Sequence, residues 1–170
     1  MYTILDTKQV TELSTLRHGW FSPHYELTDG TYSYGELSYD WLSRRWATAT
    51  TATGSWLFKR DGIFSRTILI VDQNGVYVGK TTRDWFSRKR SLTLQTGFKA
   101  EFYRSSLLYP EFVWESSGYG TIMRIKSFPF NLNDTIYIDP SMTPASVMPL
   151  LIFLGMHLTI LRRRRRAAHY

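Results

Sequence analysis

The segment before the C-terminus constrains the fold of this chain most. Pro140–Leu161 contains no formally charged side chain, and five consecutive arginines, Arg162–Arg166, follow it. Within this segment, Ala145–Leu161 has twelve apolar residues in seventeen, and they leave no polar face on a helix. A helix that is apolar on all sides must be buried, either in lipid or in the middle of a protein. The sequence therefore predicts a buried C-terminal helix with a basic end.

The rest of the chain has the composition of a β-rich globular domain. Its 170 residues are enough for one domain, residues 1–170, with a substantial core. Aromatic residues make up 16% of the chain and interleave with Thr, Ser, Val and Ile, which is typical of sheet surfaces. The net charge is +7, and the arginine run supplies five of these charges. The basic character is therefore concentrated at the C-terminus.

The chain lacks the residues that several classes of chemistry require. The chain has no cysteine, which excludes disulfides, thiolate metal sites and a cysteine nucleophile. The histidines, His18, His24, His157 and His169, show no metal-ligand spacing. No nucleophile elbow and no glycine-rich phosphate loop is present. We therefore expect no enzymatic activity, no metal and no cofactor. Because residues 1–19 do not read as a signal peptide, we expect a cytoplasmic location, with membrane association left open.

Turn residues divide the region before the helix into short strands. Asp29-Gly30, Asp61-Gly62 and Asn74-Gly75 each separate two β-prone runs. Residues Thr3–Arg17 fit either a short helix or a further strand. The spacing is that of an antiparallel meander of about ten strands over residues 25–139. The predicted strands are residues 25–28, 31–39, 45–53, 55–59, 66–72, 76–82, 92–96, 98–104, 111–115, 121–126 and 135–139.

The apolar helix has two candidate environments. We expect it over residues 144–161, with Thr143 as N-cap, Pro149 tightening or kinking its first turns, and residues 162–170 as a basic tail. Eighteen helical residues span about 27 Å, slightly less than a bilayer core of roughly 30 Å. A transmembrane anchor with cytoplasmic arginines would also export the β-domain without an export signal. We therefore favour a closed antiparallel barrel that encloses the helix, and keep the single-pass anchor as the alternative.

This order of elements resembles the tubby C-terminal-like superfamily, which includes tubby-like domains, LURP-one-related proteins and phospholipid scramblases. The resemblance covers about Tyr25 to Arg166 and implies a mainly β fold, a twelve-stranded barrel threaded by a hydrophobic helix. It also implies an association with membrane lipids. The chain lacks the acylated cysteine cluster and the Asp-rich calcium loop expected of scramblases. The residues that carry the resemblance are Tyr25–Leu27, Asp29-Gly30, Tyr32–Gly35, Trp56–Phe58, Ile68–Asp72, Asn74-Gly75, Val78-Gly79, Phe112–Trp114, Ile136–Ile138, Pro144 and Val147–Leu161.

Two basic clusters are the candidate binding residues. Clustered arginines beside an apolar helix can bind anionic lipid head groups, at about 1 kcal/mol each near the surface. The alternative is a solvated tail that caps the helix. Trp85-Phe86 precede the second cluster and predict either a membrane contact or a hairpin turn with one aromatic side chain packed inward. The candidate residues are Arg162, Arg163, Arg164, Arg165 and Arg166, and Arg88, Lys89 and Arg90.

The leading functional hypothesis is a non-enzymatic barrel that binds an anionic phospholipid surface. The alternatives are the single-pass membrane protein and a scaffold that binds a protein partner without lipid. Nucleic acid is not expected, because the aromatic residues alternate within strands and do not form a stacking face. His157, inside the apolar helix, is expected to be buried and bonded to a carbonyl or hydroxyl group.

Overall fold

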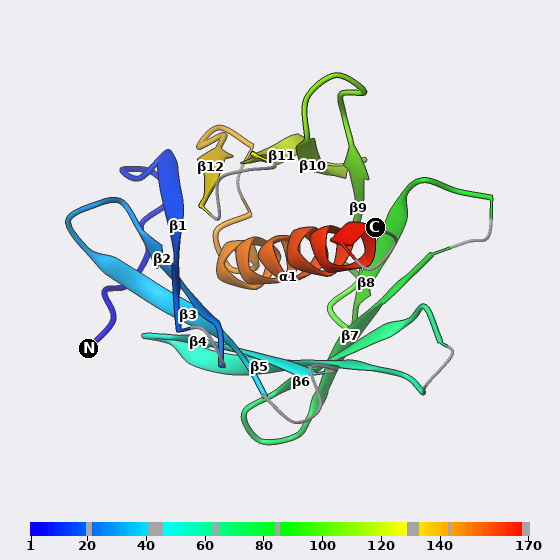
Figure 1. Cartoon of the computed structure of the whole chain (residues 1–170), viewed down its shortest axis with the longest axis horizontal. Coiled ribbons are helices and arrows are strands. Elements are labelled where there is room, and N and C mark those ends of the chain that lie inside the picture. Colours follow the sequence, from blue (N-terminus) through cyan, green and yellow to red (C-terminus); the bar gives the residue numbers. More distant parts are fainter. Residues whose placement is uncertain are drawn as a thin grey trace.

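The computed structural model describes residues 1–19, 22–40, 46–62, 65–83, 86–128, 133–142 and 144–167. Twelve antiparallel strands form a closed barrel in which each strand pairs with its neighbours in sequence, and β1 pairs with β12 to close the ring (Figure 1). The predicted mainly β fold, a closed antiparallel barrel with a C-terminal helix, is confirmed. The predicted residues Trp85, Thr143 and His169 lie outside the described residues.

Of the opening residues Thr3–Arg17, which fit either a short helix or a strand, those from Glu12 onward form a strand and residues 3–11 form neither. The strands are β1 Glu12–His18, β2 His24–Thr28, β3 Ser33–Tyr39, β4 Trp46–Thr51, β5 Gly54–Arg60, β6 Ile68–Asp72, β7 Tyr77–Thr82, β8 Arg90–Leu94, β9 Lys99–Arg104, β10 Glu111–Ser116, β11 Gly120–Ser127 and β12 Asp134–Ile138.

Side chains alternate between the inside and the outside of the barrel, as the period of a strand requires. In β8, Arg90, Leu92 and Leu94 are buried, while the two residues between them are exposed. In β4 the inward positions are Ala47 and Ala49, whose short side chains leave space for a further element inside the ring. The barrel is therefore filled by its own side chains together with a central helix.

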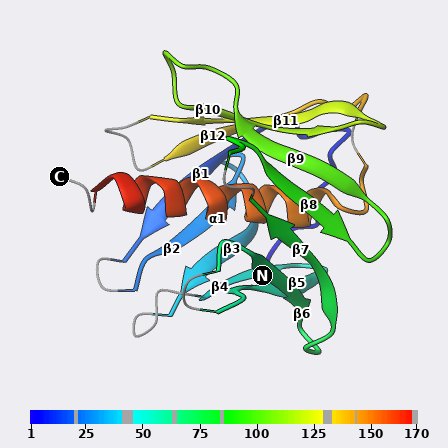
Figure 2. The same cartoon turned by 90° about the vertical axis from the view of Figure 1, so that its right-hand side faces the viewer.

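The helix α1 (Met148–Ala167) occupies the centre of this ring (Figures 1 and 2). Eleven residues in a row, from Leu150 to Ile160, are buried, so no side of this stretch faces water. The helix begins later than expected, because Pro149 takes a first-turn position where its missing N–H has no bond to make. It also continues through the arginines to Ala167. Among the described residues, no helix combines the length and apolar character that a membrane span requires.

Close approach between helix and wall depends on glycine at two positions. A Cβ on Gly155 would lie 2.7 Å from Ile125 Cδ1 and 2.9 Å from Trp114 Nε1. A Cβ on Gly35 of β3 would lie 2.8 Å from Phe153 Cζ of the helix. These distances are shorter than van der Waals contact, so larger residues would push the helix away from the wall.

Candidate anion-binding site

Five arginines from two separate parts of the chain converge at the mouth where α1 ends. Two of them, Arg162 and Arg165, lie three positions apart on one face of the helix. Arg83 follows β7, Arg88 lies in the β7–β8 connection, and Arg90 begins β8. They surround a cavity of about 100 Å³, here called the arginine pocket. Its described lining contains no carboxylate: Arg83, Arg88, Arg90, Phe102, Tyr103, Leu158, Leu161, Arg162 and Arg165.

The arginine pocket concentrates positive charge in a partly desolvated place. Burial, and then the neighbouring guanidinium groups, lower the pKa of Arg162 and of Arg165 below the ordinary value. Burial lowers the pKa of Arg90 to about 10, and Arg165 and Arg83 add to the effect. Each guanidinium thus disfavours its neighbours' charge, and a bound anion would relieve this repulsion. Arginine forks suit phosphate and carboxylate oxygens because they donate two parallel hydrogen bonds.

Arg90 is the most deeply fixed member of the arginine pocket. It is buried, and its Nη1 donates to the backbone oxygen of Arg66 at 2.7 Å and to Thr81 Oγ1 at 2.9 Å. It therefore forms the floor of the pocket, while Arg88 and Arg165 lie nearer to solvent. A small anion could therefore enter past the exposed arginines and bind against the fixed guanidinium of Arg90.

The other arginines of the run have different surroundings. Arg163 forms a bidentate ion pair with Asp134, at 2.9 and 3.1 Å, and the Asp134 side chain is buried. The guanidinium of Arg164 lies 4.1 Å from the centre of the Tyr39 ring, and its buried Nη1 has no hydrogen-bond partner. Arg166 is exposed. The predicted cluster is thus divided: two members line the arginine pocket, two anchor the helix to the wall, and one faces solvent.

The second predicted cluster is divided in the same way. Arg88 and Arg90 line the arginine pocket, whereas Lys89 Nζ bonds Glu101 Oε2 at 2.6 Å on the outside of the barrel. Phe86 is exposed, so this described member of the Trp85-Phe86 pair does not pack inward. Arg83 lies outside both predicted clusters. Counting strands could have found it, because alternate connections of an antiparallel barrel lie at the same mouth.

A neutral polar layer separates the arginines from the apolar core. Tyr39 Oη lies 2.9 Å from His157 Nδ1, and the imidazole stacks on Phe58 with ring centres 5.6 Å apart. This confirms the expected buried histidine with a hydroxyl partner. Burial, followed by the charges of Arg164, Arg90 and Arg60, lowers the pKa of His157 to about 3. His157 is therefore neutral at physiological pH, and within the described part of the chain no group of His, Asp and Glu is arranged to hold a metal.

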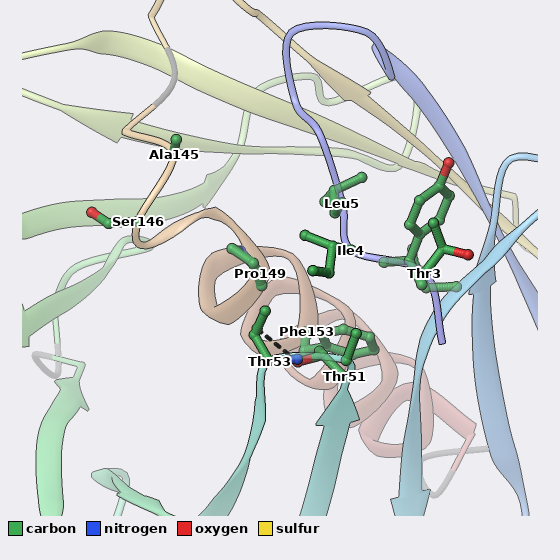
Figure 3. Close-up of a pocket in the computed structure, with 12 residues that line it drawn as sticks. Thr3, Ile4, Leu5, Thr51, Thr53, Ala145, Ser146, Pro149 and Phe153 are labelled. Atoms are coloured by element: carbon green, nitrogen blue, oxygen red, sulfur yellow. Dashed lines mark hydrogen bonds between the residues drawn. The ribbon is translucent and has the colours of Figure 1, made fainter. Parts of the chain in front are cut away.

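The opposite mouth contains a larger cavity of about 290 Å³ (Figure 3). The N-terminal segment closes one side of it, held by a bond from Thr3 N to the Ser33 oxygen at 2.8 Å. Its described lining has no ionic side chain, so the cavity offers hydroxyl and apolar contacts but no charge recognition. The lining residues are Thr3, Ile4, Leu5, Leu27, Tyr34, Thr51, Ala52, Thr53, Ala145, Ser146, Pro149 and Phe153.

Comparison of the chain with models of protein families, with curated proteins and with solved structures finds no match. The candidate site therefore rests on its own geometry. Of the two mouths, the one with the arginine pocket carries the chemistry to select a ligand by charge.

Proposed function

We propose that this protein is a non-enzymatic, cytoplasmic barrel that binds anionic phospholipid surfaces peripherally through the arginine pocket. One observation carries the proposal: five arginines surround a single cavity whose described lining has no carboxylate to neutralise them. A cavity of about 100 Å³ suits one phosphate group and excludes a bulky polyanion from its interior. The remaining parts of a lipid would stay outside the mouth.

The surroundings of the helix support a surface contact over an inserted anchor. The apolar residues of α1 are already buried against the barrel, and only its basic end reaches the mouth (Figure 2). Basic side chains near an anionic membrane contribute about 1 kcal/mol each. We also propose that this chain is homologous to the tubby C-terminal-like superfamily. The twelve-stranded barrel around a helix agrees with that fold, and lipid association is the property that the likeness would bring.

The arginine pocket can be tested with a charge-matched pair of double variants. We expect R162Q/R165Q to weaken binding to vesicles with about 30% phosphatidylserine by about 2 kcal/mol, or roughly 30-fold. The control K80Q/K99Q removes the same charge from exposed positions on β7 and β9 and should change affinity less than about threefold. Vesicle cosedimentation at about 50 and 200 mM salt measures both effects, and wild-type binding should weaken with salt.

Three results would count against this function. Equal loss in both double variants would mean diffuse charge attraction, and no loss in either would place the lipid site elsewhere. Absence of wild-type binding at low salt would favour a scaffold that binds a protein partner. Both double variants of this binding test keep Arg163, because its removal would leave the buried Asp134 without its ion pair.

A further inference from the structure

Large apolar side chains stand in solvent around the same mouth as the arginine pocket. Phe86 is fully exposed, and Leu107 and Leu108 are 80% and 86% exposed. Tyr109 and Phe128 are exposed as well. We call these five residues the apolar rim. Scattered apolar residues are normal on a protein surface, but a group of them at one functional edge indicates a contact with another apolar phase.

The topology brings the apolar rim together. Its members come from the β7–β8 and β9–β10 connections and from the end of β11. Strands β7 to β12 are consecutive around the barrel, so these connections are neighbours at one mouth. The helix starts after β12 at the opposite mouth and runs back, which brings its basic end to this rim. The apolar rim and the arginine pocket therefore share one edge of the molecule.

The β9–β10 connection is held in a shape that displays its side chains. Arg104 Nη2 donates to the Leu107 oxygen at 2.9 Å, and Tyr109 N donates to Ser106 Oγ at 3.1 Å. Figure 2 shows this connection projecting from the barrel wall. Part of its backbone is thus hydrogen-bonded within the protein, while Leu107 and Leu108 make little contact with it. These internal bonds reduce the cost of moving the connection out of water.

The connections that follow β1, β3, β5 and β7 share a sequence pattern, two large apolar residues followed by serine: Trp20-Phe21-Ser22, Trp41-Leu42-Ser43, Ile63-Phe64-Ser65 and Trp85-Phe86-Ser87. Apart from Phe86, these large apolar residues lie outside the described residues. The opposite mouth also has exposed apolar side chains, Ile4, Tyr32, Val76, Tyr119 and Met142, but the described lining of its cavity has no ionic side chain. The combination of exposed apolar side chains with clustered arginines therefore distinguishes the mouth of the arginine pocket.

We propose that the apolar rim enters the interfacial layer of an anionic bilayer, with the barrel axis along the bilayer normal. This inference rests on the proposed function and adds to it the depth and orientation of binding. Arg88 lies two residues from Phe86 in the same connection, and both are exposed, so a cation and an apolar group stand close together at this mouth. That is the composition that membrane-surface segments use, with apolar groups below the head groups and arginines among them. Charge complementarity selects a lipid surface as the occupant.

Site-specific fluorescence can measure the depth, because the chain has no cysteine of its own. L108C and V76C each provide one labelling site for an environment-sensitive dye, on the apolar rim and at the opposite mouth respectively. Both positions are exposed. On vesicles with about 30% phosphatidylserine, the dye at position 108 should shift to the blue and brighten several-fold, and acyl-chain quenchers should reduce it. The dye at position 76 should not change.

A second variant separates this inference from the proposed function. We expect L107S/L108S to bind vesicles at least about tenfold more weakly and to keep the salt dependence. Cosedimentation with an unchanged dye signal at position 108 would overturn insertion and leave lipid binding by the arginine pocket intact. Equal shifts at both positions would overturn the orientation. If neither the wild-type protein nor the labelled variants sediment with the vesicles, the proposed function and this inference are both wrong.

Discussion

Replacing Leu154 by aspartate should prevent the barrel from folding. Leu154 is fully buried at the middle of α1, where helix and wall meet on all sides. A carboxylate there has no partner, and its burial costs several kcal/mol. That is comparable with the whole stability of a small domain, about 5–15 kcal/mol. Near-ultraviolet circular dichroism and thermal melting of the purified variant measure the result.

The control is L154M, which keeps the volume and the apolar character of the side chain. It should fold and lose less than about 1.5 kcal/mol. If L154D instead melted as cooperatively as wild type, the helix would be dispensable for the β-domain. This is what an anchor helix outside the barrel would give, and the enclosed-helix account would be wrong.

Replacing Arg163 by glutamine should destabilise the protein by about 3–5 kcal/mol at neutral pH, because it leaves a buried carboxylate without its counter-charge. Asp134 is 1% exposed, and Arg163 is its bidentate partner. The control R166Q removes the same charge from an exposed position and should change the free energy of unfolding by less than about 0.5 kcal/mol. Denaturant unfolding monitored by fluorescence gives both values.

The loss of unfolding free energy caused by R163Q should also depend on pH. Burial raises the pKa of Asp134 above its ordinary value, while Arg163 and a hydrogen bond from Ser127 act in the opposite direction. Without Arg163 the pKa rises further. A carboxyl with a raised pKa in the folded state favours folding below its unfolded pKa, and this contribution is lost as the pH rises through the folded pKa. The deficit should therefore be smallest near pH 4 and largest at neutral pH.

The double variant D134N/R163Q should recover much of the lost stability, since no charge is then buried. A deficit that is the same at pH 4 and pH 7, or a double variant as unstable as R163Q, would show that the ion pair is not what anchors the helix end. Either result would require another reason for the helical state of the arginine run.

The general fold could be predicted from the sequence because its signals are local. The turn at Asn74-Gly75 lies where expected, with Asp72 Oδ1 accepting bonds from Asn74 N and Val76 N. The all-round apolar character of the helix required an enclosure. The strand β1 remained undecided, because its identity depends on pairing with β12 at the far end of the chain. Such a long-range contact leaves no local pattern.

For the candidate site, the sequence predicted the basic clusters but not how their side chains are arranged. Both basic clusters were identified, but the division of the arginine run depends on where each side chain meets the barrel wall. Asp134 stands at a strand end, where aspartate commonly supports a turn, and is instead the buried partner of Arg163. Asp29 does support its turn, by accepting bonds from Thr31 N and Tyr32 N. Both aspartates stand at the boundary of a strand, and tertiary burial decides the role of Asp134.

Hydrogen exchange of the whole protein, with and without vesicles containing about 30% phosphatidylserine, tests the central claim most directly. The account predicts that amides of residues 148–160 stay protected in both states, because the helix remains inside the barrel. Amides of residues 86–90 and 105–110 should gain protection when vesicles are added. Loss of protection across the barrel strands on binding would mean that the helix leaves the barrel for the lipid, and unchanged exchange in both connections would mean that this mouth does not meet the membrane.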